Sequence, residues 1–307
     1  MQLEERINKI LKKYFGFNSF RENQRDIITS SVIQGRDVYV SMATGAGKSL
    51  CFQMPPLVLR KTAIIISPLI SIMEDQLLKL SSYVMLCLEI LVNHHHHLIR
   101  LGIKVCHYSA GTQTNSEIHQ KVIGGYYRLI YMSPEKAMTS LDMIQELYES
   151  DTLCLFGIDE VHCLSHWGHD FRRDFRDLHR LRQLCPDVPV MALTATSTCE
   201  IQKDVCELLK LRETAVFESS RNRPNIFYKT IYKSSGSNGQ TKDFKRIIKV
   251  INEVTKSNNG NSVSTIIYCP TINLTHEINS YLKTTGGFKS ECYNSKLSKN
   301  ERSRIHK

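Results

Sequence analysis

Residues 41–49 (SMATGAGKS) could bind the phosphates of a nucleotide. They lie between an apolar run and a helical pattern, and a loop that leaves a strand and opens a helix can point successive backbone N–H groups at a phosphate. Gly45 and Gly47 allow the left-handed backbone that such a loop needs. Lys48 could reach the β- and γ-phosphates, and Ser49 could bind Mg²⁺. The predicted phosphate-binding residues are Thr44, Gly45, Ala46, Gly47, Lys48 and Ser49.

A pair of adjacent carboxylates, Asp159 and Glu160, follows the apolar run 153–158. Residues at the carboxyl ends of parallel strands face the ligand crevice of an α/β sheet. Asp159 is then placed to hold Mg²⁺ together with Ser49, and Glu160 to orient or deprotonate an attacking water. The alternative interpretation, two solvated acids at the end of a strand, is less favoured because a phosphate-binding loop is present. Together the two runs predict ATP hydrolysis.

The elements that position these residues are strands and helices in alternation. Apolar runs rich in β-branched residues occur at 38–42, 63–67, 129–132, 153–158 and 188–193. Runs that are apolar throughout suit strands covered on both faces, as in a parallel sheet. Ile201, Val205 and Leu208 form one face of a helix, with capping-box spacing between Ser197 and Glu200. We therefore predict a doubly wound α/β domain over residues 1–220.

A second α/β unit is predicted over residues 221–307, after a break near residues 219–224. Residues 226–231 and 265–269 are its expected strands, and residues 298–307 form a helix that the end of the chain cuts short. This unit has room for only a few strands, so we expect it to be an incomplete domain.

Composition adds weaker constraints. The formal net charge of +10 favours a polyanionic partner, although charge alone does not define one. The ten cysteines are scattered without a C-x-x-C pair, which indicates reduced thiols in an intracellular protein and no zinc site. Residues 83–92 are apolar but too short to span a bilayer, so no membrane association is expected. With the four histidines 94–97 they belong to an atypical insertion, 81–101, between a predicted helix (70–80) and a strand (103–108). Adventitious metal binding by the histidines is the alternative.

The ordered set of motifs resembles the RecQ family of superfamily 2 DNA helicases, closest to its Werner-like and plant Werner-like members. The matching runs are 11–28 (LKKYFGFNSFRENQRDII), 42–55 (MATGAGKSLCFQMP, including Met42 in place of a glycine), 67–76 (SPLISIMEDQ), 131–136 (YMSPEK), 159–162 (DEVH), 163–175 (CLSHWGHDFRRDF), 191–196 (MALTAT), 265–270 (TIIYCP) and 293–306. The resemblance implies two RecA-like domains, ATP and Mg²⁺ as ligands, and 3′–5′ unwinding of single-stranded, branched or partly duplex DNA. It also implies roles in DNA repair, recombination and replication in the nucleus.

The resemblance also assigns roles to single residues. Phe17 and Arg21 match positions that sandwich the adenine, and Gln24 matches the position that reads its edge; core packing is the alternative for Phe17. Lys48, Asp159, Glu160 and His162 match the catalytic set, in which the histidine links the ATP site to the DNA-sensing motifs. Thr194 and Thr196 match residues that couple hydrolysis to movement.

Trp167, the only tryptophan, lies in a loop that matches the family's aromatic-rich loop. Aromatic faces beside arginines suit stacking on single-stranded bases, so Trp167, Phe171 and Arg172 are the expected DNA contacts. An anchoring role for Trp167 in the loop is the alternative. His166 stands where many family members have Gln or Glu.

The sequence departs from the family pattern in its second domain. Motifs V and VI are expected to be missing, and motif VI supplies an arginine that completes the ATP site. Two hypotheses follow: an ATP-dependent RecQ-type DNA helicase, or a truncated protein that binds ATP and nucleic acid without unwinding. A metabolic kinase with the same phosphate loop is disfavoured, because it would not explain the motif order or the aromatic loop.

Overall fold

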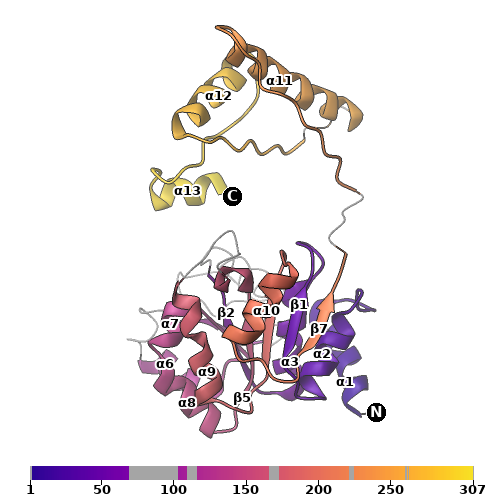
Figure 1. Cartoon of the computed structure of the whole chain (residues 1–307), viewed down its shortest axis with the longest axis vertical. Coiled ribbons are helices and arrows are strands. Elements are labelled where there is room, and N and C mark those ends of the chain that lie inside the picture. The colour runs from indigo at the N-terminus through magenta and orange to yellow at the C-terminus, as the bar shows by residue number, and fades with distance from the viewer. Residues whose placement is uncertain are drawn as a thin grey trace, which may run out of the picture. The chain divides into compact units, whose positions relative to one another are not determined.

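The computed structural model describes residues 2–68, 103–108, 116–165, 173–220, 225–259, 261 and 263–306 (Figure 1). The chain divides into two units, Met1–Arg223 and Pro224–Lys307, and each is considered by itself. Three predicted features lie outside the described residues. They are the insertion 81–101, the helix 70–80 and the part of the aromatic-rich loop that contains His166, Trp167, Phe171 and Arg172.

The first unit contains a parallel sheet of seven strands in the order β3-β4-β2-β5-β6-β1-β7. The strands are β1 (Val38–Ser41), β2 (Thr62–Ile66), β3 (Val105–His107), β4 (Leu129–Met132), β5 (Leu153–Ile158), β6 (Val190–Thr194) and β7 (Ala215–Glu218). All recorded pairings are parallel, for example Val40 with Leu193 and Ile66 with Ile158. The doubly wound parallel sheet predicted from the continuous apolar runs is thereby confirmed.

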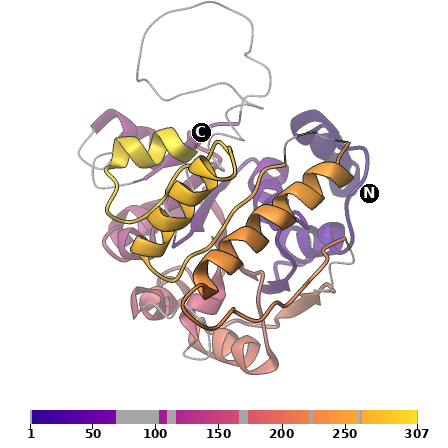
Figure 2. The same cartoon turned by 90° about the horizontal axis from the view of Figure 1, so that it is seen from above.

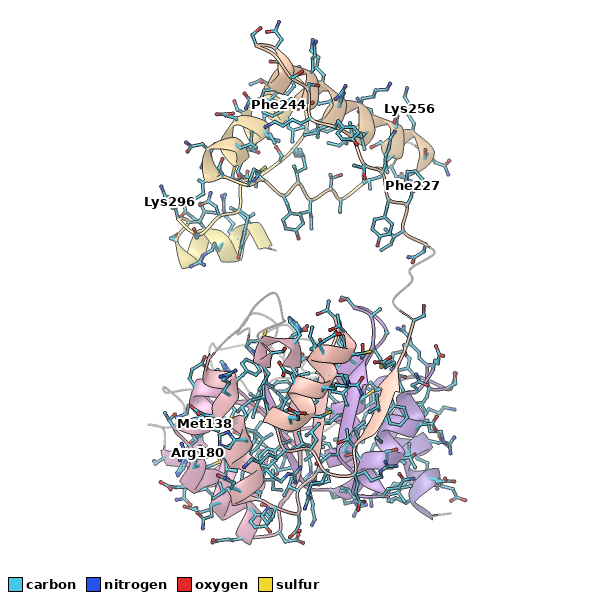
Figure 3. All side chains as sticks on the ribbon, viewed as in Figure 1. Met138, Arg180, Phe227, Phe244, Lys256 and Lys296 are labelled. Atoms are coloured by element: carbon cyan, nitrogen blue, oxygen red, sulfur yellow. The ribbon has the colours of Figure 1, made fainter. Side chains whose placement is uncertain are left out.

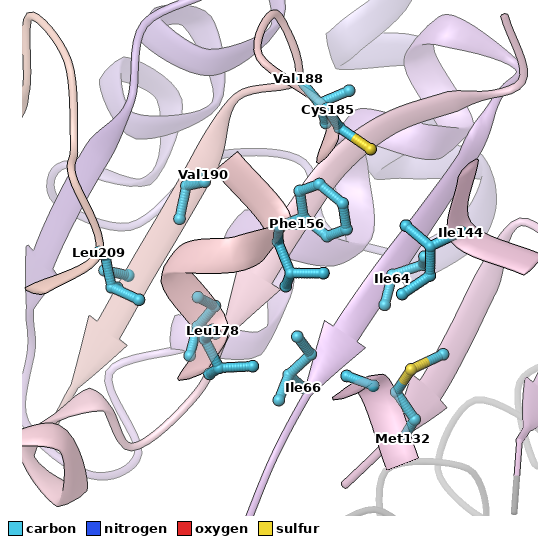
Figure 4. Close-up of a cluster of buried hydrophobic side chains, with 14 of the residues drawn as sticks. Ile64, Ile66, Met132, Ile144, Phe156, Leu178, Cys185, Val188, Val190 and Leu209 are labelled. Atoms are coloured by element: carbon cyan, nitrogen blue, oxygen red, sulfur yellow. The ribbon is translucent and has the colours of Figure 1, made fainter. Parts of the chain in front are cut away.

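Helices cover both faces of this sheet (Figure 1). One face packs against α1 (Gln2–Ile10), the π-helical turn η1 (Leu11–Phe15), α2 (Gln24–Val32) and α3 (Lys48–Leu59). The other packs against α6 (Ser116–Ile123), α7 (Pro134–Met138), α8 (Leu141–Glu149), the 3₁₀ turns η2 (Val161–Leu164) and η3 (Arg173–Leu178), α9 (His179–Leu184) and α10 (Cys199–Leu208). Each face has its own apolar core, and Figure 4 shows part of the second around Phe156, Ile64 and Leu178.

The two cores explain why the strand sequences are apolar throughout. All six residues of β5 and all five of β2 are buried, because each strand is covered on both faces. Packing between β5 and α3 is tight at Gly157, where an added Cβ would lie 2.8 Å from Ile65 Cδ1 and 3.2 Å from Phe52 Cβ. Strand β5 therefore brings α3, and with it the loop that precedes α3, directly onto the sheet.

Several boundaries differ from the sequence prediction. The edge strand β7 was not predicted, because its residues are only partly buried and form no continuous apolar run. The N-cap of α10 is Thr198, whose hydroxyl accepts a hydrogen bond from Ile201 N at 3.3 Å, and not Ser197. The Ser197 hydroxyl instead bonds Tyr39 Oη at 2.6 Å inside the core, so tertiary packing overrides the local capping pattern.

The second unit consists of three helices and extended segments in its described part (Figures 1 and 2). The helices are α11 (Gly239–Ser257), α12 (Ile272–Thr284) and α13 (Lys299–His306). Helices α11 and α12 meet through Phe244 and Tyr281, whose ring centroids are 5.3 Å apart.

The strands predicted at 226–231 and 265–269 are not formed, so that prediction was wrong. These segments are extended, but a strand is defined by pairing with a neighbour, and β-branched composition alone does not supply one. Their large apolar side chains are largely exposed, as with Phe227 at 87% and Ile266 at 78% (Figure 3). Among the described residues of both units, no helix is long and apolar enough to cross a membrane.

Candidate functional site

The loop after β1 has the backbone that phosphate binding requires. Gly45 and Gly47 have positive φ angles of 85° and 96°, and the loop is closed by a hydrogen bond from Ala46 N to Ala43 O at 3.1 Å. A Cβ on Gly47 would collide with the Gln24 amide, so this position has no room for a side chain. Helix α3 starts at Lys48, and the N–H groups of its first turn therefore face the loop.

The segment before α2 is fastened to this loop by two side chains. Arg21 donates from Nη1 to Gly45 O at 2.6 Å, and Gln24 donates from Nε2 to Gly47 O at 3.1 Å. Gln24 also accepts from Arg21 N at 2.9 Å and is 3% exposed. One N–H and one lone pair of its amide remain for an adenine edge. Phe17 is 49% exposed, which leaves its ring open for stacking. The adenine-binding roles of these residues remain predictions.

Lys48 lies between the loop and the carboxylates. Its Nζ donates to Met42 O at 2.9 Å, which leaves its other N–H groups available to phosphate oxygens. Burial lowers the pKa of Lys48, while the negative charges of Glu160 and Asp159 act in the opposite direction. Ser49 follows in the first turn of α3 and is half-buried.

Asp159 and Glu160 stand at the carboxyl end of β5. Asp159 N donates to Ile66 O at 2.8 Å, which ties the residue to the end of β2. The side chain is only 6% exposed, and burial, followed by repulsion from Glu160, raises the pKa of Asp159 to about 6. Glu160 has a left-handed backbone (φ 54°), a strained conformation for a residue with a side chain. This turn separates the two carboxylates, and Glu160 N donates to Asp159 Oδ1 at 3.0 Å.

His162 connects these carboxylates to β6. Its Nδ1 is 3.3 Å from Glu160 Oε2 and 3.0 Å from Thr194 Oγ1. Hydrogen bonding with Cys163 and with Glu160 raises the pKa of His162 to about 9, and the same contact with His162 lowers the pKa of Glu160. Thr194 is fully buried; its hydroxyl donates to Thr196 O at 2.7 Å and accepts from Thr196 N at 3.1 Å. A continuous polar chain therefore runs from Glu160 to the exposed Thr196.

The donors and acceptors present fit a magnesium–nucleotide complex. The loop offers backbone N–H groups and an ammonium to phosphates, while the Ser49 hydroxyl and the Asp159 carboxylate are the oxygen ligands that Mg²⁺ prefers. Among the described residues, no group of three or more His, Cys, Asp and Glu side chains could hold a metal by itself. A hydrated Mg²⁺ shared with phosphates needs only one or two protein ligands, which is what this site provides.

Sequence reasoning overlooked two contacts that shape the site. Asn23, the N-cap of α2 with φ 63°, donates from Nδ2 to Ser219 Oγ at 3.2 Å and so links the loop segment to the residue after β7. The second contact is the hydrogen bond from Lys48 Nζ to the Met42 carbonyl. A main-chain acceptor of this kind cannot be inferred from a pattern of residue types. Asn adopts a left-handed backbone more readily than most residues, so an Asn just before a helical pattern is a signal that the sequence offers. The long-range partner of that Asn is not.

Comparisons with known proteins agree with this geometry. The family model described as DEAD/DEAH box helicase matches residues 21–205. A protein of Acanthamoeba polyphaga mimivirus that is provisionally named an ATP-dependent RNA helicase is 35% identical over 302 residues, which are 98% of this chain and 49% of the viral protein. The ATP-dependent DNA helicase RecQ of Haemophilus influenzae is 38% identical over 221 residues, which are 71% of this chain and 32% of RecQ. The chain thus spans half or less of the length of these relatives.

A solved structure supports the fold independently. The helicase MrfA bound to DNA superposes with a TM-score of 0.67 at 18% sequence identity, over 98% of this chain and 42% of that one. At that identity the likeness concerns the fold alone, which is RecA-like.

Proposed function

We propose that this chain, which belongs to the DEAD/DEAH box helicase family, carries the ATP-binding part of a RecQ-type DNA helicase. The observation that carries the proposal is the meeting of Lys48, Asp159 and Glu160 at one edge of the sheet, beside a loop in which Gly47 has no room for a side chain. The relative named as the ATP-dependent DNA helicase RecQ favours DNA as the partner. The 3′–5′ movement and the roles in nuclear DNA repair, recombination and replication are proposed from the resemblance of the sequence motifs to the RecQ family. RNA is the alternative nucleic acid, because the viral relative is named an RNA helicase.

The residues divide the work of hydrolysis among them. Backbone N–H groups of residues 44–49 and the Lys48 ammonium neutralise the phosphates and hold them in place, which is most of what phosphoryl transfer requires. Mg²⁺ would be held by Ser49 and Asp159 and would supply positive charge to the phosphate oxygens. Glu160, which stays ionised because His162 lowers its pKa, orients the attacking water.

The polar chain from Glu160 through His162 to Thr194 gives a physical route for coupling. A change in charge beside Glu160 alters how strongly its carboxylate holds the imidazole. The imidazole Nδ1 lies within reach of both Glu160 and Thr194, so a stronger hold by one weakens its bond to the other. Thr196, at the exposed end, would pass the change to the nucleic acid.

A second candidate is a protein that binds ATP and nucleic acid without unwinding. It is favoured by the described part of the second unit, which forms three helices and no paired strand. Robust DNA-stimulated ATPase without strand separation would support this alternative.

The proposal is tested by comparing Lys48→Ala and Glu160→Gln with the unchanged chain. Lys48→Ala should weaken binding of a fluorescent ATP analogue at least tenfold, because a half-buried ammonium is lost from the phosphates. Glu160→Gln should keep nucleotide affinity within about threefold but lower ATPase by at least a hundredfold, because the attacking water loses its carboxylate partner while the phosphate-binding groups are unchanged. Lys203→Ala, an exposed lysine of α10, is the matched control and should change neither. Equal loss of binding in both site variants, or none in either, would contradict these roles.

A further inference from the structure

A basic cleft lies at the edge of the sheet opposite the ATP site. Its cationic lining consists of Arg6, Lys9, Lys13, Arg60, Lys104 and Arg128, and its volume is about 440 Å³. Three of these cations lie just before strands: Arg60 before β2, Lys104 before β3 and Arg128 before β4. The cleft therefore lies at the edge of the sheet where the strands begin. The phosphate loop and Asp159 follow strand ends, so a strand length, roughly 15 Å, separates the two sites.

The charges of this cleft are not compensated by any acidic side chain in the part of the chain that the structure describes. None of the described residues that line it is acidic, and none of the six cations lies within ion-pair distance of a carboxylate in the described part of the chain. Burial, followed by the nearby charge of Arg60, lowers the pKa of Arg6, so these two cations lie close enough to repel each other. Crowded, partly desolvated cations repel one another, and a bound anion would relieve that repulsion.

The cations form two walls rather than a compact cage. Arg6, Lys9 and Lys13 recur at helical spacing along α1 and η1, so they form a row on one side, with a rise of about 5 Å between neighbours. On the other wall, Lys104 O accepts from Arg128 N at 2.7 Å, and Lys104 Nζ lies 3.4 Å from the centroid of the Tyr126 ring. A row of cations that faces a second, fixed basic wall suits a linear polyanion better than a compact one.

Aromatic surface accompanies the charge on both walls. Tyr14 belongs to the helical wall and Tyr126 to the strand wall, and Tyr126 is 37% exposed. Tyrosine rings beside phosphate-binding cations are the combination that binds single strands without regard to base sequence.

We propose that this cleft is a second nucleic-acid contact, which holds the phosphates of a single strand away from the ATP site. The inference goes beyond the proposed function in assigning a new site, and it rests on that function only for the nature of the ligand. The site would keep a strand attached to the first unit independently of the nucleotide state, because it lies at the other edge of the sheet.

The test uses the full chain and a fluorescein-labelled oligodeoxythymidine, followed by anisotropy between about 50 and 200 mM salt. Lys9→Glu/Lys13→Glu should weaken binding about tenfold or more, and should reduce the slope of log affinity against log salt by about 1.4, because each lost phosphate contact of a single strand accounts for about 0.7. Lys104→Glu, on the opposite wall, should weaken binding in the same direction. The matched control is Arg180→Glu/Lys203→Glu, two exposed cations of α9 and α10 on the other face of the sheet, which changes the net charge equally (Figure 3 labels Arg180).

The outcomes separate this inference from the proposed function. Losses confined to the cleft variants, with nucleotide affinity unchanged, support it, as does photocrosslinking of a bromodeoxyuridine-containing strand to Tyr14 or Tyr126. Equal losses in cleft and control variants, or none in either, overturn the inference while the proposed function stands. Failure of the unchanged chain to bind any strand while it still binds ATP overturns both the inference and the assignment of DNA as partner. If the cleft variants lose binding of inorganic tripolyphosphate but keep that of the strand, the site serves a compact anion and the inference is wrong.

Discussion

At the scale of single residues, the site contains a carboxylate whose ionised form is unfavourable in the folded protein without a ligand. Asp159 is almost fully buried, and burial raises its pKa to about 6, well above the ordinary value of 3.8. Its charge becomes favourable only when cations join Lys48 beside it. If Asp159 holds Mg²⁺ as proposed, the position exchanges stability of the free protein for the ability to hold a metal–nucleotide complex, as is common at functional sites.

Replacing Asp159 by Asn should stabilise the free protein at neutral pH. Because the folded-state pKa is raised, the folded form binds more protons than the unfolded form between about pH 4 and 6, so stability falls as pH rises through that window. A shift of about 2 pKa units corresponds to about 3 kcal/mol, and we expect Asp159→Asn to recover about 1–3 kcal/mol at pH 7. Urea unfolding without Mg²⁺ measures this gain, which should shrink toward pH 5.

The same variant should lose its advantage when ligand is added. Mg²⁺ and ATP need the ionised carboxylate, so they should stabilise the unchanged chain and leave Asp159→Asn nearly unaffected, and ATPase of the unchanged chain should fall below about pH 6. Asp142→Asn, an exposed position on α8, is the control and should alter neither stability nor activity. A loss of stability in Asp159→Asn at pH 7 would show that its charge is already compensated in the free protein.

At the scale of elements, one buried ion pair joins parts of the chain that sequence reasoning treated separately. Asp37, just before β1, accepts from Arg182 Nη2 at 2.7 Å through Oδ1 and at 2.6 Å through Oδ2. It also accepts from Val190 N at 2.8 Å and from Arg212 N at 2.6 Å. A single carboxylate thus fixes the starts of β1 and β6, the last turn of α9 and the approach to β7. Both side chains are buried, at 1% and 7% exposure.

Asp37→Ala should therefore destabilise the first unit by about 3–5 kcal/mol. The change leaves the Arg182 guanidinium buried without its counter-charge and two backbone N–H groups without an acceptor. Thermal or urea unfolding measures the loss. Asp187→Ala, an exposed acid in the nearby turn, is the control and should cost under about 1 kcal/mol. A small effect at Asp37 would mean that water replaces the carboxylate at these groups.

These contacts also show what the sequence could and could not predict. Strands such as 129–132 and 153–158 were predicted with the observed bounds, because burial on both faces leaves an unbroken apolar run. The backbone of the loop before α3 was predictable because its signal is local, with Gly45 and Gly47 at the positions of positive φ; its binding of phosphate stays a prediction. Asp37 with Arg182, and Asn23 with Ser219, join residues more than a hundred positions apart, and no local pattern records such a pairing. The extended segments of the second unit were wrongly predicted to be strands. Apolar, β-branched composition shows that a segment is able to form a strand, but it does not show that a neighbouring strand is present to pair with it.

At the scale of the whole molecule, the two units differ in how much they bury. The first has two apolar cores, one on each face of its sheet, whereas the described apolar side chains buried in the second are Ile278, Leu282 and Cys292. Tyr232 and Tyr268 there are both 91% exposed. Because apolar burial is the main favourable contribution to folding, the resistance to unfolding should be very uneven along the chain.

Amide hydrogen exchange of the full chain should reveal this difference and its response to ATP. We expect slow exchange in β2 and β5 and fast exchange in α11 and α12. ATP at a hundred times its Kd should slow exchange in the first unit by the equivalent of about 2.7 kcal/mol, because it binds only the folded form. Lys48→Ala should remove this response without changing exchange in the absence of ATP. If ATP slows exchange equally in α11 and α12, the nucleotide binds both units at once, and the second contributes groups to the ATP site.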